Sequence, residues 1–409
     1  MDQAIAAAAG NDAVYASSVS ASGSARLEQA LARDALLPNA TAHGQYLYTQ
    51  PNGVRNQGGQ IGSQAAPRFI ANNAIREYAA QFMVNETVDV ASYADLQRTR
   101  ALALAAAANL ESARRDLTLR VVQLYFGVVA AQSKLEVATQ ARDEARNFTK
   151  LTGELESGRE VAHADAVKAD LELQQRMREW SDASLAEERA RLDLGALLFA
   201  DPRTPYTLAV DPAPSLPAEA DVEASAAKNN PDLRSALESR KAADAEVLGA
   251  RAGYLPALSF NYTYGIDAPQ FAVNGPDGVR NLGYSASATI DFPVWDWFAT
   301  HDRVKQSQVQ LRAARIALTA TQRTLIAQLQ EFYHEAQVAS DQVTSLQTSV
   351  QTAQESLRLT KLRYQAGEAT ALEVVDAESS LALVESQQAD GILRYRVALA
   401  NLQTLTGVL

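Results

Sequence analysis

Four segments of the chain alternate between apolar and polar residues, with the period of two that is typical of β-strands. They lie at about residues 40–50, 81–90, 257–267 and 283–292. Serine, threonine, asparagine and aspartate occupy most positions of one predicted face, and Glu86 interrupts the other. The predicted apolar face consists of Ala40, Ala42, Tyr46, Tyr48, Phe82, Val84, Val88, Val90, Leu258, Phe260, Tyr262, Tyr264, Ile266, Tyr284, Ala286, Ala288, Ile290 and Phe292.

Two interpretations fit these segments. Each segment has the length of a tilted strand that crosses a bilayer, with its apolar face in lipid and its polar face in a water-filled lumen. A soluble antiparallel sheet with one face in water gives the same alternation. Four strands are too few to close a membrane barrel, and an open sheet edge cannot face lipid. The membrane interpretation therefore requires several chains to share one barrel.

Long helices are predicted for much of the remaining chain. Between about residues 297 and 364 there is no proline or glycine, and apolar residues recur every three or four positions, as in a coiled-coil seam. Gly367 interrupts the pattern, and Thr370 and Glu373 form a capping-box pattern that predicts the start of a second helix. The predicted seam consists of Leu325, Leu329, Phe332, Ala336, Ala339, Val343, Leu346, Val350, Ala353 and Leu357.

The same seam occurs 208 residues earlier, where Tyr125 corresponds to Tyr333. A repeat of this length indicates a tandem duplication. The predicted repeats are 1–200 and 219–409, and each contains a helix, two strands and a helical hairpin, at about 95–199 and 297–407. An inter-repeat segment at 201–218 is rich in proline, and "YTLAV" at Tyr206–Val210 predicts a short strand within it. We expect Gly158 to end the first long helix as Gly367 ends the second.

The hexapeptides "PNGVRN" at Pro51–Asn56 and "PDGVRN" at Pro276–Asn281 lie between the paired strand segments. Asn-Gly and Asp-Gly are common in the turns of β-hairpins. We therefore predict that both hexapeptides connect the strands of a hairpin.

Composition excludes several classes of function. The net charge is −11, and no basic stripe with interleaved aromatic residues occurs, so we expect no nucleic-acid binding. The chain has no cysteine, and its four histidines do not have metal-ligand spacing. Neither a phosphate-binding loop nor a nucleophile elbow occurs, so no enzyme activity and no cofactor are predicted. No apolar run is long enough for a transmembrane helix, and no signal peptide is recognisable.

Several longer strings resemble the TolC-like outer membrane factors, the exit ducts of Gram-negative efflux pumps and type I secretion systems. They are "NNPDLRSA" at Asn229–Ala236, "ARAGYLPALSF" at Ala250–Phe260 and "RYQAGEATALEVVDAESSL" at Arg363–Leu381, with first-half echoes at Gly10–Ser17 and Leu31–Ala42. The resemblance implies a membrane β-barrel joined to a long α-helical barrel. Each tandem-repeat, mainly α-helical protomer would contribute four strands to a trimeric 12-stranded barrel. The inter-repeat segment would lie in an equatorial belt.

The resemblance also implies a function and partners. The chain would form a homotrimeric channel in outer membrane lipid, as a passive conduit that a periplasmic adaptor (membrane fusion) protein opens at its tip. An inner-membrane transporter of the RND, ABC or MFS type would supply the energy. The alternative is a structural or adaptor-like periplasmic coiled-coil protein with a soluble β-sheet.

For the periplasmic aperture, the resemblance implies carboxylates just after the tip turns, which are Asp165, Glu373 and Asp376 here, and a tyrosine, Tyr364, that helps to lock the tip. Structural roles are alternatives, because Glu373 fits a helix cap and Tyr364 continues the seam. One member of the family has an arginine shortly after the tip glycine, and the matching residue here is Ala369. Arg159 in the first half is a candidate substitute.

A lipid-facing set with an aromatic girdle is also predicted for the strands and the residues that follow them. Trp295 and Trp297 follow the last strand, where they mark a membrane–water boundary or pack at a strand-to-helix corner. The full set is Tyr46, Tyr48, Phe260, Tyr262, Tyr264, Tyr284, Trp295 and Trp297.

Overall fold

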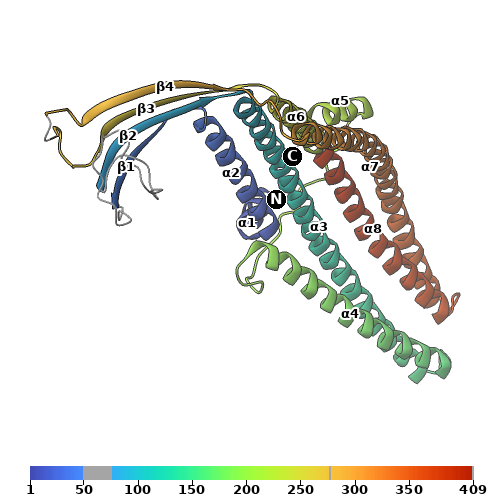
Figure 1. Ribbon diagram of the computed structural model, residues 1–409. Helices are drawn as coiled ribbons and strands as arrows, with labels where there is room; N and C mark the ends of the chain where they lie inside the picture. Colours follow the sequence, from blue (N-terminus) through green and yellow to red (C-terminus); the bar gives the residue numbers. More distant parts are fainter. Residues whose placement is uncertain (49–75, 276–277, 408–409) are drawn as a thin grey trace. The chain divides into compact units, whose positions relative to one another are not determined.

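The computed structural model describes residues 1–48, 76–275 and 278–407, which form long helices and one antiparallel sheet (Figure 1). The chain forms two compact units, of which unit 1 contains Met1–Gly23, Ala105–Leu237 and Ala317–Leu409 and unit 2 contains Ser24–Leu104 and Glu238–Ile316. The elements are α1 (Asp2–Asn11), α2 (Ala13–Asp34), β1 (Asn39–Tyr48), β2 (Arg76–Val88), α3 (Val90–Ser157), α4 (His163–Leu198), α5 (Glu219–Asn229), α6 (Pro231–Ala252), β3 (Ala257–Ala268), β4 (Leu282–Asp291), α7 (Ala299–Gln365) and α8 (Ala371–Thr406).

The sheet lies in unit 2 and has the order β1-β2-β3-β4, with every neighbouring pair antiparallel. Directly paired residues share a face, and the register places Ala42, Phe82, Tyr264 and Tyr284 in one row. The adjacent row on the other face is Thr41, Met83, Thr263 and Ser285. The predicted apolar positions within the strands therefore lie on a single face, and Glu86 lies among them, paired with Phe260.

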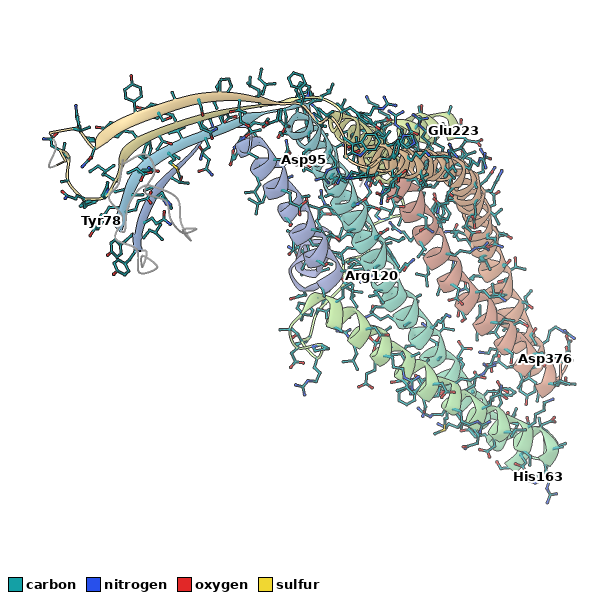
Figure 2. The ribbon with its side chains drawn as sticks, viewed as in Figure 1. Tyr78, Asp95, Arg120, His163, Glu223 and Asp376 are labelled. Atoms are coloured by element: carbon teal, nitrogen blue, oxygen red, sulfur yellow. The ribbon has the colours of Figure 1, made fainter. Side chains whose placement is uncertain are left out.

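The opposite face of the sheet is polar. There Gln81 donates a hydrogen bond to Asp267 at 3.2 Å, and the hydroxyls of Thr87 and Ser259 are 3.4 Å apart. Tyr78, on the apolar side of β2, contacts Tyr46 across the strand pair with ring centroids 4.9 Å apart (Figure 2). Most residues of the edge strands β1 and β4 are exposed in the single chain, whereas most residues of β2 are partly buried.

The strand boundaries differ from the prediction where side chains cap the following helix. β2 begins at Arg76 and ends at Val88, so Val90 is in α3 and not in the strand. The reason is Asp89, whose carboxylate accepts a hydrogen bond from Ser92 N at 2.6 Å and so starts the helix. At β4, Asp291 is the last strand residue, and Asp296 caps α7 by accepting from Thr300 N at 2.7 Å.

The helical seams form the core of unit 1. In α7 the predicted positions Leu325, Leu329, Ala336 and Ala339 are buried, and the corresponding stretch of α3 buries its own apolar residues. These α3 residues pack against α4 and α1 in one apolar cluster, which includes Leu117, Val121, Tyr125, Val128, Leu194 and Ala8. The helices α4 and α8 each contain 36 residues, and α3 and α7 contain 68 and 67. The two halves thus have the same order of strands and long helices.

The prediction of a short strand at Tyr206–Val210 was wrong. These residues form no strand, and helix side chains donate hydrogen bonds to the carbonyl groups of Tyr206 and Ala209. The inter-repeat segment accepts five hydrogen bonds of this kind. The donors are Arg191 of α4 to Tyr206 O at 2.7 Å, Tyr125 of α3 to Ala209 O at 2.6 Å, Arg396 of α8 to Asp211 O, Tyr395 of α8 to Pro214 O at 2.9 Å and Tyr333 of α7 to Pro217 O at 3.3 Å.

The turn hexapeptide at Pro51–Asn56 lies outside the described residues, as do the first two residues of the second hexapeptide. Within the second, Gly278 has a left-handed backbone with φ of 77°.

Candidate functional site

The two long hairpins of unit 1 reverse through turns with the same hydrogen bonds. After α7, Gly367 N donates to Tyr364 O and Glu368 N donates to Arg363 O. After α3, the corresponding donors are the amides of Arg159 and Glu160, which bond to Glu156 O and Leu155 O. This pattern, in which a left-handed residue follows the helix, satisfies the last carbonyl groups of the helix.

The two turns differ in the type of residue at the left-handed position. Gly367 has φ of 74°, but in the first turn Arg159 has φ of 61° and Gly158 is not in the left-handed region. α3 ends at Ser157, so Gly158 directly follows the helix, and the left-handed residue is the next one, Arg159. Counting 208 positions back from Gly367 gives Arg159, so the duplication places the two residues at equivalent positions.

The two turns are held together by a small apolar cluster, which we call the tip cluster. Tyr364 is buried at 7% exposure, and its ring centroid is 5.2 Å from that of Phe148 on α3. Ala169 of α4 and Ala371 and Val374 of α8 are buried in the same cluster, and Ala369 is partly buried against it. Figure 2 shows His163 and Asp376 near the turns of their respective hairpins. The seam position predicted for Tyr364 is therefore also a contact between the hairpins.

Glu373 has the capping role that the sequence predicted. Thr370 Oγ1 accepts from Glu373 N at 3.3 Å, and the Glu373 carboxylate accepts from Thr370 N at 3.1 Å, which completes a capping box. Arg363 lies 3.3 Å from the same carboxylate and also donates to Glu368 O. The hydrogen bond from Thr370 N, with help from Arg363, lowers the pKa of Glu373. Glu373 is nevertheless exposed, so its negative charge faces solvent.

Glu373 and Asp376 border one open groove between α7 and α8, with a volume of about 760 Å³. Hydroxyl groups dominate the rest of its wall. The lining residues are Ser345, Thr348, Ser349, Thr352, Ala353, Ser356, Thr360, Glu373, Asp376, Ala377 and Ser380. Asp165, the third predicted aperture carboxylate, is in the first turn of α4 and does not border this groove. The structure thus brings together two of the three predicted carboxylates.

Sequence reasoning did not identify a charged cluster that joins the hairpins. Lys361 of α7 lies 2.5 Å from Glu144 of α3 and 3.0 Å from Glu378 of α8. Burial raises the pKa of Glu378. Burial opposes the charge of Lys361, but the two ion pairs outweigh it and raise the pKa of the ammonium group. Glu378 lies on the buried side of α8. In the sequence, a charged residue among the apolar positions of this helix was the only sign of the charged cluster.

A second contact in this region joins α4 to α8. Arg176 is buried, pairs with Glu172 at 2.7 Å and donates to Ser379 Oγ at 2.6 Å. Arg363, which precedes Gly367, pairs with Glu373 and donates a hydrogen bond to Glu368 O in the second turn, whereas Ala369 has no charge. Arg159, the candidate substitute, is an exposed side chain in the first turn.

The predicted lipid-facing residues are exposed in the single chain. Trp295 and Trp297 are 64% and 83% exposed, so they are not packed into the corner between β4 and α7. Tyr46, Tyr48, Phe260, Tyr262, Tyr264 and Tyr284 are exposed as well.

Among the described residues, no group of three or more His, Cys, Asp or Glu side chains is arranged to hold a metal ion. Within the same parts of the chain, none of the helices combines the length and apolarity needed to cross a membrane.

Comparison with known proteins found outer membrane and secretion proteins. The family model described as outer membrane efflux protein matches residues 224–408. Outer membrane protein OprJ of Pseudomonas aeruginosa is 23% identical over 71% of this chain, and TolC of Escherichia coli is 23% identical over 45%. The alkaline protease secretion protein AprF of P. aeruginosa is 22% identical over 98% of the chain. The matched segments span 61% of OprJ, 39% of TolC and 82% of AprF.

Solved structures of outer membrane channels have the same fold. The Campylobacter jejuni CmeC outer membrane channel matches with a TM-score of 0.80 at 16% identity, over 99% of this chain and 85% of CmeC. The open state of the Neisseria gonorrhoeae MtrE outer membrane channel matches with a TM-score of 0.81 at 18% identity, over 99% and 88% of the two chains. These comparisons favour the predicted fold class and not the soluble coiled-coil alternative. Residues 224–408 therefore match the outer membrane efflux protein family, and the chain is similar to proteins named as outer membrane proteins and outer membrane channels.

Proposed function

We propose that this chain is one protomer of a homotrimeric exit duct in the outer membrane. The observation that carries the proposal is the four-stranded sheet, in which one face is apolar and exposed and β1 and β4 have no neighbouring strand on their outer sides within the described residues. Backbone groups at an open edge cannot remain unpaired in lipid. Pairing β4 of one copy with β1 of the next satisfies both edges, and three copies give the 12 strands of a closed barrel.

In this arrangement the apolar face meets lipid and the polar face lines a water-filled lumen. The exposed aromatic residues Tyr46, Tyr48, Tyr262, Tyr264, Tyr284, Trp295 and Trp297, together with Phe260, form the lipid-facing and interfacial set. The polar pairs Gln81–Asp267 and Thr87–Ser259 lie on the lumen side.

The hairpin turns form the periplasmic end of the duct. Threefold symmetry makes rings of Glu373 and Asp376, which attract cations at the aperture, and Asp165 adds a further ring on the neighbouring hairpin. Tyr364 holds the end closed through the tip cluster. A periplasmic adaptor protein opens it, and an inner-membrane transporter of the RND, ABC or MFS type supplies the energy. The duct itself is a passive conduit and catalyses no reaction.

The test is assembly and conductance. Replacing Phe260 and Ile290 with Asp places charges in lipid, where each is strongly unfavourable, so we expect loss of the membrane-inserted trimer. The matched control is Asn261→Asp with Thr289→Asp, which are the next residues on the same strands and face the lumen. The wild-type and control chains should give detergent-stable trimers and single-channel conductance in planar bilayers. Recovery of the wild-type chain as a soluble monomer without detergent would refute the proposal.

A further inference from the structure

In unit 2, the two repeats of one chain pack against each other through α3 and α6. A methyl group on Gly249 of α6 would lie 3.5 Å from the Cβ atom of Ala94 on α3, so the two backbones run close together there. α6 also contacts α7, where Asp244 lies 3.7 Å from Arg315. Within this unit, α6 of the second repeat therefore contacts both α3 of the first repeat and α7 of its own.

The duplication identifies the corresponding residues of the other helices. The string "ARDALLPN" at Ala32–Asn39 aligns with "ARAGYLPA" at Ala250–Ala257, so α2 corresponds to α6 at a distance of 218 residues. α3 corresponds to α7 at the 208 residues that separate the two helical seams. Burial agrees with this second distance, because Thr99 and Ser307, which correspond, are both buried.

The counterparts of the contact between the repeats are exposed. Leu31 of α2 corresponds to Gly249, and Asp302 of α7 corresponds to Ala94. Leu31 is 69% exposed, and Leu27, one turn earlier on α2, is 68% exposed. Asp302 is exposed as well, whereas Ala94 is buried. The contact that α6 makes with α3 is thus left open at α2 and at α7 in the single chain.

Burial differs between α3 and α7 at further corresponding positions. Ala101 of α3 is 6% exposed, whereas Val309 of α7 is 64% exposed. Ala108 is 3% exposed, whereas Ile316 is 65% exposed. In each pair, the residue of α7 has the larger apolar side chain, and burying such a side chain is favourable. The exposed side of α7 therefore has apolar side chains that a further helix would cover.

We propose that α7 of one copy packs against α2 of the next copy through the contact that α3 makes with α6 within one chain. The inference rests on the proposed function, in which β4 of one copy pairs with β1 of the next. α2 leads into β1 and α7 follows β4, just as α6 leads into β3 and α3 follows β2. Antiparallel pairing places the end of one strand beside the start of its neighbour, so the two helices leave the sheet side by side. Leu27 and Leu31 of the next copy then cover the exposed apolar side of α7.

Lipid does not suit this side of α7. The exposed charged residues Asp302, Lys305 and Arg312 occur among its apolar positions. Charged side chains are unfavourable in hydrocarbon, whereas at the rim of a contact between helices they can extend into water. A helix of a second copy satisfies both kinds of residue.

Disulfide formation tests which residues meet. The chain has no cysteine, so an introduced pair supplies the only thiols. The 3.5 Å separation at Gly249 and Ala94 is within the range of the two Cβ atoms of a disulfide. Leu31→Cys with Asp302→Cys should therefore link neighbouring copies when detergent-solubilised trimers of the full chain are mildly oxidised. The control is Leu31→Cys with Val309→Cys, whose second cysteine lies two turns, about 10 Å, further along α7. Denaturing gels should show at least about five times more cross-linked trimer for the first pair.

A second variant tests whether the contact contributes to assembly. Leu27→Ser with Leu31→Ser should leave the fold of the single chain intact, since both side chains are exposed there. Its trimers should dissociate in detergent at least about five times faster than the wild type, because apolar contact between the copies is lost. The matched control is Leu248→Ser, an exposed leucine of α6 that should not affect dissociation.

Two outcomes would overturn the inference. They are equal cross-linking of the two cysteine pairs, and equal dissociation rates for Leu27→Ser with Leu31→Ser and for the Leu248→Ser control. Single-channel conductance is measured on the same preparations. If the wild type forms conducting trimers but the cysteines at positions 31 and 302 do not cross-link, the helix contact is wrong and the duct stands. If the wild type forms no membrane trimer, both proposals fail.

Discussion

At the scale of single residues, the two hairpin turns provide a comparison of side chains in the same backbone conformation. Gly367 and Arg159 both occupy the left-handed position, with φ of 74° and 61°. A side chain in this conformation costs roughly 1–2 kcal/mol, and glycine avoids that cost. The backbone of the second turn is therefore unstrained at Gly367, whereas the backbone of the first turn is strained at Arg159.

We predict opposite effects of substitution at the two turns. Gly367→Ala should destabilise the second turn by about 1–2 kcal/mol, which is about 5–30-fold faster hydrogen exchange at the Glu368 amide. Arg159→Gly should slow exchange at the Glu160 amide, because it removes the strain, although the greater freedom of unfolded glycine offsets part of the gain. Hydrogen–deuterium exchange read by mass spectrometry measures both changes.

Gly158→Ala is the control for these variants. Gly158 is not in the left-handed region, so alanine should leave exchange at the first turn unchanged or slow it slightly. If Gly158→Ala accelerated exchange as much as Gly367→Ala, the assignment of the left-handed position to Arg159 would be incorrect.

The sequence predicted the contacts between residues that are close together in the chain. The capping box of Thr370 and Glu373 follows from their spacing alone, and the structure confirms it. The contact of Arg363 with Glu373 was not predicted, because it depends on how the turn folds back on its helix. The charged cluster around Lys361 depends on side chains from three helices, and no spacing along one helix indicates such a contact.

At the scale of elements, the inter-repeat segment shows how an extended chain is held without strand pairing. Tyr125 is buried and donates to Ala209 O, and its counterpart in the second repeat, Tyr333, donates to Pro217 O from a half-exposed position. The prolines at 212, 214 and 217 have no N–H group for a sheet. The alternation in Tyr206–Val210 suggested a strand, but the carbonyl groups were satisfied by side chains that a local pattern cannot identify.

The buried tyrosine should matter more than the half-exposed one. Tyr125→Phe removes a 2.6 Å hydrogen bond that a buried side chain donates to Ala209 O, so we expect local destabilisation near the upper end of about 0.5–1.5 kcal/mol. Tyr333→Phe should cost about 0.5–1.5 kcal/mol, since water can replace the hydroxyl. The measurement is the rate of limited proteolysis within the inter-repeat segment of the assembled protein. Equal rates in the two variants would contradict the role given to burial.

The strands were easier to predict than the inter-repeat segment, because each face has one environment along its whole length. Leu258, Phe260, Tyr262 and Tyr264 alternate without exception, and the register places them on the expected face. The ends were harder to predict, since Asp89 belongs to the cap of α3 although it fits the alternation. An alternating pattern indicates which side of a strand faces which environment, but not where a helix cap ends that strand.

At the scale of the whole molecule, the proposed trimer explains features that have no role in a single chain. The outer edges of β1 and β4, which have no neighbouring strand among the described residues, become an interface, and exposed aromatic residues become a lipid boundary. Glu373 and Asp376, which border a groove in one protomer, become charges repeated three times around an axis. Close like charges oppose one another's ionisation, but the hydrogen bond from Thr370 N and the contact with Arg363 lower the pKa of Glu373 and keep it charged.

The last prediction concerns the selectivity of the pore. Glu373→Gln with Asp376→Asn removes both charges, and glutamine still fits a capping box, so α8 should begin where it does in the wild type. We expect the cation preference, measured as the reversal potential in a salt gradient, to fall by at least about half. Because the folded state lowers the pKa of Glu373, its contribution to cation preference should be present at neutral pH and disappear as the pH falls through that lowered value. Glu355→Gln is the control, since this exposed α7 carboxylate does not border the groove. An unchanged reversal potential in the double variant would exclude both carboxylates from the aperture, whereas a change in Glu355→Gln of the same size would show that overall charge, and not a ring at the aperture, determines selectivity.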